Sequence, residues 1–291
     1  MPQPLALQYV QYLLSARMVN KYKGDITMDS IFNPIEQSSY DIRDYTIKAS
    51  SNFPETFSVD ILPPIKNQWS QSTCVAHALS SAIEYHHQRQ HGFYVPFSTE
   101  FIYGFRSNGD YVGDGMDVRD ALNTILKYGD VYEEDCKGNH NYKKAMENVS
   151  KDIDHLKELA YPHRISGYFK INTVDELKTA LMSHGVVVVS MRVYDGHRLV
   201  KDVYTYDNTK DYGSHCVFIY GWNKKGWLVQ NSWGKWYGWD GRFIIPFDFK
   251  FTQMWGITDN ITDGNIIKPK KNKWLNVIYK IINKVVNLFQ K

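Results

Sequence analysis

The chain has 291 residues and a formal net charge of +3, and 43% of its residues are hydrophobic. This length can bury one large core or two modest ones, and the composition is that of a globular protein rather than a disordered one. The near-neutral charge, with no long basic block between residues 50 and 260, argues against nucleic-acid binding. Three cysteines are few for a disulfide-rich secreted fold, which favours a reducing compartment, cytoplasmic or virion-like, over a secreted or lysosomal one. A Cys136–Cys216 disulfide remains open.

The first 52 residues form an N-terminal segment with its own pattern. Leu7, Val10, Leu14 and Met18 recur at helical spacing and predict a short amphipathic helix. The stretch after them has little periodicity, and we expect it to run extended across a surface.

The next part of the chain, up to residue 165, is predicted to be rich in helix. One face of a first helix is formed by Val75, Leu79, Ala82, Ile83 and His86. Ser72 and Thr73 precede this helix and are expected to cap it. A second helix is predicted over residues 116–128, closed by Gly129, and more helix around residues 143–159.

Residues 166–260 are predicted to be rich in strand. Residues 186–191 are a continuous run of mostly β-branched side chains, and residues 215–222 and 226–231 predict two strands around a turn. Residues 242–246 predict another strand, and residues 174–184 predict a helix. A helical half followed by a sheet half predicts an α+β protein with two lobes.

Cys74 lies at the first turn of the first predicted helix. Backbone N–H groups and the helix dipole favour a thiolate there, and a neighbouring imidazolium would lower the thiol pKa further. Cys74 is therefore a candidate nucleophile. The alternative is a buried apolar cysteine, which is the commoner fate of this residue type.

The segment PPIKNQWSQSTCVAHALSSA resembles the active-site segment of the papain and cathepsin family of cysteine proteases. In that family a glutamine precedes the nucleophilic cysteine by six positions, as Gln68 precedes Cys74 here. The resemblance implies that the Gln68 side-chain amide and the Cys74 backbone N–H hold the oxyanion that develops on the substrate carbonyl. A surface-loop glutamine is the alternative for Gln68.

Two downstream segments complete the resemblance. GSHCVFIYGW resembles the strand that carries the catalytic histidine, which implies His215, and VQNSWGKWYGWDGRFII resembles the Asn-Ser-Trp-Gly segment, which implies Asn231 and Trp233. Asn231 would orient the imidazole, and Trp233 would shield their hydrogen bond from water. His215 follows Cys74 by 141 residues, within the family's range of about 130–150.

A further segment, YVGDGMDVRDALNTILKYGDV, resembles the glycine-containing rim that hydrogen-bonds an extended substrate. The resemblance implies Gly113, Asp114 and Gly115 as substrate-binding residues. An ordinary loop before a helix is the alternative, since glycine permits close backbone approach but does not require it.

The sequence also departs from the family pattern. Gln71 stands where the family has a disulfide-bonded cysteine, Val75 replaces an aromatic residue, and Cys216 replaces a small one. These departures indicate a divergent branch without the usual disulfides, and they remove no catalytic group.

The resemblance implies a two-lobed papain-like fold, with a helical lobe, an antiparallel sheet lobe and the cleft between them. We expect a pro-segment at 1–52 that inhibits by occupying the cleft, a peptidase domain at 53–263 and a separate tail at 264–291. The expected function is a peptidase made as a zymogen, acting on peptide or protein substrates without cofactor. Two alternatives are a catalytically silent peptide-binding homologue and a membrane-attached interaction protein.

The tail predicts a basic amphipathic helix, since apolar residues from Trp274 to Phe289 share one face and lysines and asparagines the other. Such a helix can contact a membrane surface or a partner, or pack on the protein itself. We expect no metal site, because His86, His87, His91 and His140 lack a second cluster at ligand spacing.

Overall fold

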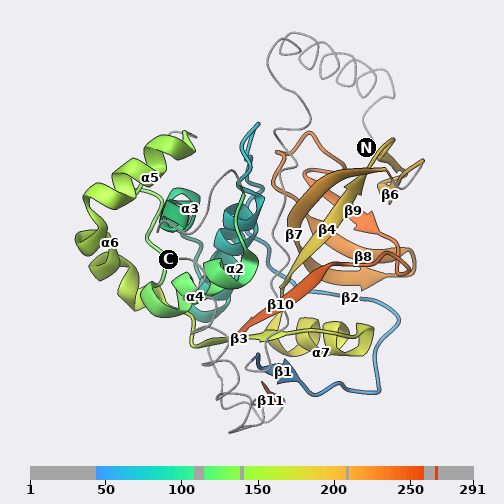
Figure 1. The fold of residues 1–291 in the computed structure, drawn as a ribbon. Coiled ribbons are helices and arrows are strands. Elements are labelled where there is room, and N and C mark those ends of the chain that lie inside the picture. Colours follow the sequence, from blue (N-terminus) through green and yellow to red (C-terminus); the bar gives the residue numbers. More distant parts are fainter. Residues whose placement is uncertain (1–43, 108–114, 138–140, 208–209, 259–265, 268–291) are drawn as a thin grey trace, which may run out of the picture.

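A helical lobe and a sheet lobe stand side by side in the computed structural model, with helix α2 (Cys74–His91) between them (Figure 1). The structure describes residues 44–107, 115–137, 141–207, 210–258 and 266–267. The predicted N-terminal helix, Gly113, Asp114 and the tail helix lie outside the described residues. The α+β class and the two lobes are confirmed.

Helix α2 is longer than predicted and is buried on nearly all sides over its first three turns. Thr73 is the N-cap residue, one of the two expected, but its side chain makes no capping bond. The backbone carbonyl of Thr73 accepts hydrogen bonds from the backbone N–H and Nδ1 of His77 instead. The helix ends at Gly92, whose φ of 79° is left-handed.

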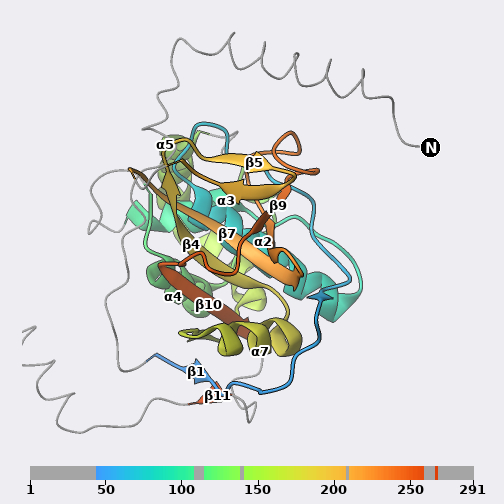
Figure 2. The same ribbon diagram turned by 90° about the vertical axis from the view of Figure 1, so that its right-hand side faces the viewer.

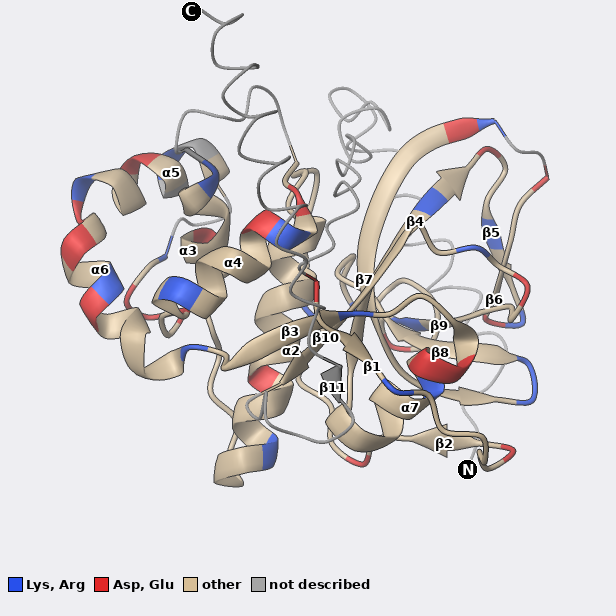
Figure 3. Ribbon diagram, turned by 60° about the horizontal axis from the view of Figure 1, so that its bottom comes forward, with Lys and Arg blue, Asp and Glu red and all other residues tan. Residues whose placement is uncertain are grey.

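The other helices of this lobe lie on the side of α2 away from the sheet (Figure 1). They are α3 (Thr99–Gly104), η2 (Phe105–Ser107), α4 (Val118–Tyr128), α5 (Tyr142–Lys151), α6 (Ile153–Ala160) and η3 (Tyr161–His163). Helix α4 confirms the helix predicted over residues 116–128, and Gly129 is its C-cap as expected. The helix expected around residues 143–159 is two helices, because Asp152 is non-helical (φ −125°, ψ 29°) and separates α5 from α6. Figure 3 shows acidic and basic residues mixed along α5 and α6.

The second lobe is a mostly antiparallel sheet in the order β11-β1-β3-β10-β4-β7-β8-β9-β6-β5, with β2 paired to β7. Its strands are β1 (Thr46–Ile47), β2 (Phe57–Ser58), β3 (Gly167–Lys170), β4 (Val187–Tyr194), β5 (Arg198–Val200), β6 (Val203–Thr205), β7 (Asp211–Asn223), β8 (Gly226–Gln230), β9 (Arg242–Ile245), β10 (Gln253–Thr258) and β11 (Ile266–Ile267). The predicted strands are β4, β7, β8 and β9.

Helix α7 (Val174–His184) packs on this sheet and has the predicted bounds. Thr173 and Glu176 form a capping box at its start, since each side chain accepts from the other residue's backbone N–H. Figure 2 shows α7 below the sheet, with β1 and β11 beyond it.

Strand β7 separates the two main cores, because successive side chains of a strand point to opposite faces. Cys216 and Phe218 belong to the core that contains α2, whereas Val217 and Ile219 belong to the core under α7. The strand thus passes the start of α2 at His215 and Cys216. No helix within the described ranges is long and apolar enough to cross a membrane.

Candidate active site

Cys74 is the first residue of α2 and is 4% exposed. The backbone N–H groups of Cys216, Val75 and Cys74 itself lie close enough to its thiol to lower the thiol pKa. The Cys216 contact places the thiol beside β7, next to His215. Burial raises the pKa of the Cys74 thiol to about 11, and the backbone donors oppose that shift.

The His215 ring is held by Asn231. Nε2 of His215 lies 2.7 Å from Oδ1 of Asn231, and the backbone N–H of Ser232 donates to the same oxygen at 2.8 Å. The backbone donor identifies that atom as the amide oxygen, so the neutral imidazole carries its proton on Nε2. Nδ1 is left with a lone pair and has no hydrogen-bond partner among the described residues.

Burial also lowers the pKa of His215 to about 4, and the bond to Asn231 opposes this shift. Burial thus favours the neutral thiol and the neutral imidazole as long as the two groups do not contact each other. A thiolate–imidazolium pair therefore requires Cys74 Sγ to meet Nδ1 directly, where the two charges attract.

Gln68 is fully buried and joins the two lobes. Its Oε1 accepts from Oγ of Ser232 at 2.7 Å, and its Nε2 donates to the carbonyl of Gln71 at 2.9 Å. Its backbone N–H donates to the carbonyl of Ser232 at 2.8 Å. Because a primary amide has two N–H groups, one donor of Nε2 is left for another acceptor. Sequence reasoning missed Ser232, whose only signal was its place in the Asn-Ser-Trp-Gly segment.

Trp233 stacks on the imidazole of His215, with ring centroids 4.4 Å apart and an interplanar angle of 25°. The ring of Tyr237 packs edge-on against the Trp233 ring, with ring centroids 4.7 Å apart. The structure therefore brings Cys74, His215, Asn231, Gln68 and Trp233 together. Gly115 is buried before α4 with a φ of 89°, and its expected contact with substrate stays a prediction.

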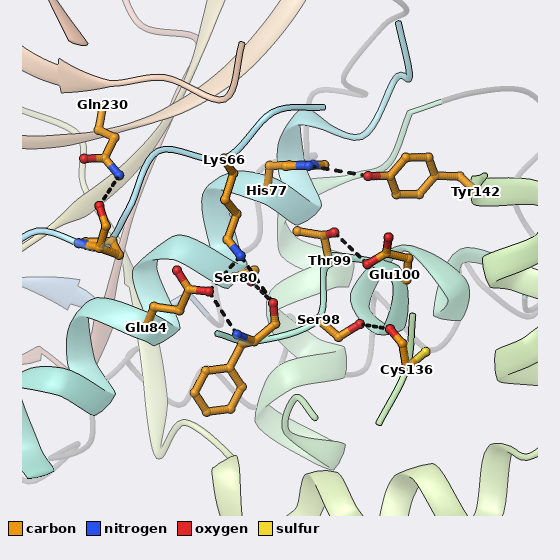
Figure 4. A network of polar contacts seen from close by, with 12 residues as sticks. Lys66, His77, Ser80, Glu84, Ser98, Thr99, Glu100, Cys136, Tyr142 and Gln230 are labelled. Carbon is orange, nitrogen blue, oxygen red and sulfur yellow. Dashed lines mark hydrogen bonds and ion pairs between the residues drawn. The ribbon is translucent and has the colours of Figure 1, made fainter. Parts of the chain in front are cut away.

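Buried polar contacts join α2 to the segments before and after it in the sequence (Figure 4). Lys66 Nζ lies 2.7 Å from Oε1 of Glu84 and donates to the carbonyl of Phe97 at 3.3 Å. The Phe97 N–H donates to Glu84 as well. These bonds fix the chain just before Gln68 against the middle of α2, which holds the loop from Gln68 to Cys74 at both ends.

All three cysteines are free, so the possible Cys136–Cys216 disulfide is absent. Cys136 lies in a third core with α6, whereas Cys74 and Cys216 share the core around α2. Across the parts of the chain that the structure describes, no three His, Cys, Asp or Glu residues are placed to hold a metal ion.

Comparison with known proteins agrees with this geometry. A family model described as papain family cysteine protease matches residues 54–262. The cathepsin B-like cysteine proteinase 3 of Caenorhabditis elegans is 29% identical over 150 residues, which are 49% of this chain and 38% of that protein. The chain thus spans less than half of that relative's length.

Solved structures share the fold. Xylellain, a cysteine protease from Xylella fastidiosa, superposes with a TM-score of 0.70 at 21% identity, covering 80% of this chain and 97% of that one. Digestive procathepsin L2 proteinase from the larval midgut of Tenebrio molitor superposes with a TM-score of 0.59 at 19% identity, covering 83% of this chain and 82% of that one. The family match covers most of the sequence, and the fold and the arrangement around Cys74 agree with it. The chain belongs to the papain family of cysteine proteases.

Proposed function

We propose that this protein is a cysteine peptidase that hydrolyses peptide bonds by acyl transfer, with Cys74 as nucleophile, His215 as base, Asn231 as the residue that orients His215, and Gln68 as an oxyanion donor. One observation carries the proposal: Asn231 and Ser232 fix His215 in the tautomer whose bare Nδ1 can accept a proton, beside the strand residue that contacts the Cys74 sulfur.

The first step is formation of the nucleophile. Rotation of the Cys74 side chain brings Sγ from the Cys216 backbone to Nδ1 of His215, and the thiol proton moves to that nitrogen. The backbone N–H groups at the start of α2 and the imidazolium then stabilise the thiolate.

Attack on the scissile carbonyl gives a tetrahedral intermediate whose oxyanion is bound by the Cys74 N–H and the remaining N–H of Gln68 Nε2. The imidazolium of His215 protonates the leaving amine from Nδ1, and a thioester to Cys74 remains. Nδ1 then takes a proton from water, which attacks the thioester and releases the acid.

The test of this function is turnover of fluorogenic dipeptide amides. Cys74→Ala should abolish hydrolysis, while Cys136→Ala, which removes a buried cysteine from a separate core, should retain it. Both variants should show the circular dichroism of the parent chain. Hydrolysis by Cys74→Ala above background would overturn the assignment of the nucleophile.

We also propose that residues 1–52 act as an inhibitory pro-segment and that the protein works in a reducing compartment. The first proposal is supported by the family, in which one structural neighbour is a procathepsin, and the second by the three free cysteines. Removal of residues 1–43 should raise the rate of amide hydrolysis if the segment inhibits. An unchanged rate would contradict that role.

A further inference from the structure

Trp69 has an unusual conformation for its residue type. It follows Gln68 directly, its φ is 51°, and its side chain is 61% exposed. A left-handed backbone is costly for any residue with a Cβ, and a large apolar side chain gains little from water. Such strain persists only where surrounding contacts hold the backbone in place, and it is common at functional sites. Trp69 lies one residue from the proposed oxyanion donor.

A second exposed tryptophan lies beside this loop. Trp236 is 64% exposed, and its ring meets Tyr237 edge-on at 5.8 Å. A Cβ on Gly234 would lie 3.1 Å both from Nδ2 of Asn67 and from Cδ1 of Trp236, so the Asn67 side chain and the Trp236 indole are neighbours across that glycine.

Asn67 connects the two tryptophans. Its Oδ1 accepts the backbone N–H of Trp69 at 2.9 Å, while its Nδ2 lies on the side of Trp236. Asn67 also pairs with Trp233 in an isolated antiparallel β-bridge, and Gly234 donates to the carbonyl of Lys66 at 3.0 Å. The two exposed indoles therefore belong to the same region, a junction where the chain before α2 meets the loop after Asn231.

The reaction chemistry tells which half of a substrate reaches this junction. His215 protonates the leaving amine, so the leaving-group half of the peptide lies on the side of His215 and of Trp233, which stacks on it. The two opposite charges of Lys235 and Asp240 in the same loop compensate each other, since Nζ and Oδ1 lie 3.9 Å apart. The junction thus offers apolar aromatic faces to the residues that follow the scissile bond.

We propose that Trp69 and Trp236 form a binding site for an aromatic or long aliphatic side chain on the leaving-group half of the substrate. The inference deepens the proposed peptidase function and rests on it for the direction of the bound peptide. Contact between such a side chain and an indole removes apolar surface of both from water, and ring pairs gain further from edge-to-face geometry.

Equilibrium binding to the Cys74→Ala variant tests this site without requiring turnover, and it is measured both on the full chain and on the chain from Asp44, which lacks most of the proposed pro-segment. The probes are two blocked, dye-labelled pentapeptides that share their first three residues and end in Phe-Phe or Gly-Gly. We expect the Phe-Phe peptide to bind about tenfold more tightly, because one aromatic side chain becomes partly buried. Trp69→Ala or Trp236→Ala should each reduce that ratio at least severalfold.

Two further variants are controls. Tyr161→Ala removes an aromatic side chain that is 57% exposed on η3 and should keep the full preference. Trp69→Gly removes the indole but suits the left-handed backbone, so its loss of preference cannot be ascribed to misfolding. Equal affinity for the two peptides, or a preference that survives loss of both tryptophans, would overturn the inference. If the preference holds but the unmodified chain cleaves neither peptides nor dipeptide amides, the catalytic proposal fails and this site stands as a peptide-binding site.

Discussion

Asn231 and Ser232 together decide which nitrogen of His215 carries the proton. The oxygen of Asn231 accepts from both the Ser232 N–H and His215 Nε2, so the ring cannot turn its bare nitrogen toward Asn231 without losing the bond. Within the described residues the amide nitrogen of Asn231 has no partner, so the orientation of this side chain depends on its oxygen.

Asn231→Ala should therefore lower kcat more than it changes KM, because the neutral ring loses its orientation but stays in place under Trp233. We expect a fall of about a hundredfold, compared with at least ten-thousandfold for Cys74→Ala. The measurement is steady-state hydrolysis of a dipeptide amide by each variant. Equal losses in the two variants would mean that Asn231 does more than position His215, and an unchanged rate would remove it from the site.

We expect the left-handed backbone of Trp69 to lower the free energy of unfolding. A residue with a Cβ in the left-handed region is destabilised by about 1–2 kcal/mol relative to glycine. Trp69→Gly should thus unfold at a higher denaturant concentration than the parent chain, with an unchanged slope m. Trp236→Gly, at an exposed position without positive φ, is the matched control and should give no such gain. A destabilised Trp69→Gly would show that the indole packs rather than strains.

Among single residues, those of the candidate site that belong to a family motif could be predicted from the sequence. The residues assigned from the Gln…Cys, His and Asn-Ser-Trp-Gly segments lie together, although they are far apart in the chain. The bond between Ser232 and Gln68 spans 164 positions and depends on how two loops meet, so no local pattern predicts it. The left-handed φ of Trp69 is equally invisible, since the sequence there carries no glycine.

Among the elements, the long amphipathic ones were predictable and the short ones were not. Helix α7 has a capping box and a glycine at its end, which mark both bounds. Helix α3 is six residues long and buried throughout, so it has no polar face to reveal its period. Strands β5 and β6 are three residues each, and their pairing is set by contact with β9 rather than by their own alternation.

Asp130 is a second residue that we expect to destabilise the fold, and it lies among the residues that contact α2. This residue is fully buried next to the helix-supporting pair Lys66–Glu84; its Oδ1 accepts from Val131 N–H, and its Oδ2 has no partner among the described residues. Burial raises the pKa of Asp130 well above its ordinary value, and the nearby Glu84 and Glu100 carboxyls add to the shift. A buried carboxylate without full hydrogen bonding destabilises the fold.

Asp130→Asn should therefore stabilise the protein at neutral pH. An acid whose folded pKa is raised favours folding when protonated, so this contribution is present below its unfolded pKa and is lost as pH rises through the folded pKa. The gain in melting temperature for Asp130→Asn should be small near pH 4 and larger near pH 8, by scanning calorimetry at both. Asp154→Asn, on the exposed face of α6, is the control and should shift neither value. A loss of stability at pH 8 would show that the carboxylate is bonded.

On the scale of the whole molecule, residues 44–52 form part of the fold. Asp44 pairs with Arg119 of α4 at 2.6 Å, Ile47 is buried under α7, and Ser50 N–H donates to Thr179 at 2.8 Å. Strand β1 pairs with β3 and with β11, so it ties the ends of the described chain together. The sequence placed a domain start near Phe53 from the resemblance alone, because a two-residue strand leaves no pattern.

Two truncations test whether this strand belongs to the stable domain. A chain that starts at Asp44 keeps β1, whereas a chain that starts at Phe53 loses the burial of Ile47 and the ion pair of Arg119. The shorter chain should melt about 5 °C or more below the longer one, because the loss of a buried isoleucine costs about 2 kcal/mol. Equal melting temperatures would place the domain boundary at Phe53.

The most direct test of the central claim is active-site titration of the chain from Asp44 with an epoxysuccinyl peptide, followed by peptide mapping. We expect hydrolysis of a dipeptide amide to fall linearly to zero at one equivalent of inhibitor, and the adduct to lie on Cys74, with Cys136 and Cys216 unmodified. Full modification of Cys74 with hydrolysis intact, or no hydrolysis and no adduct on Cys74, would rule out Cys74 as the nucleophile of a peptidase.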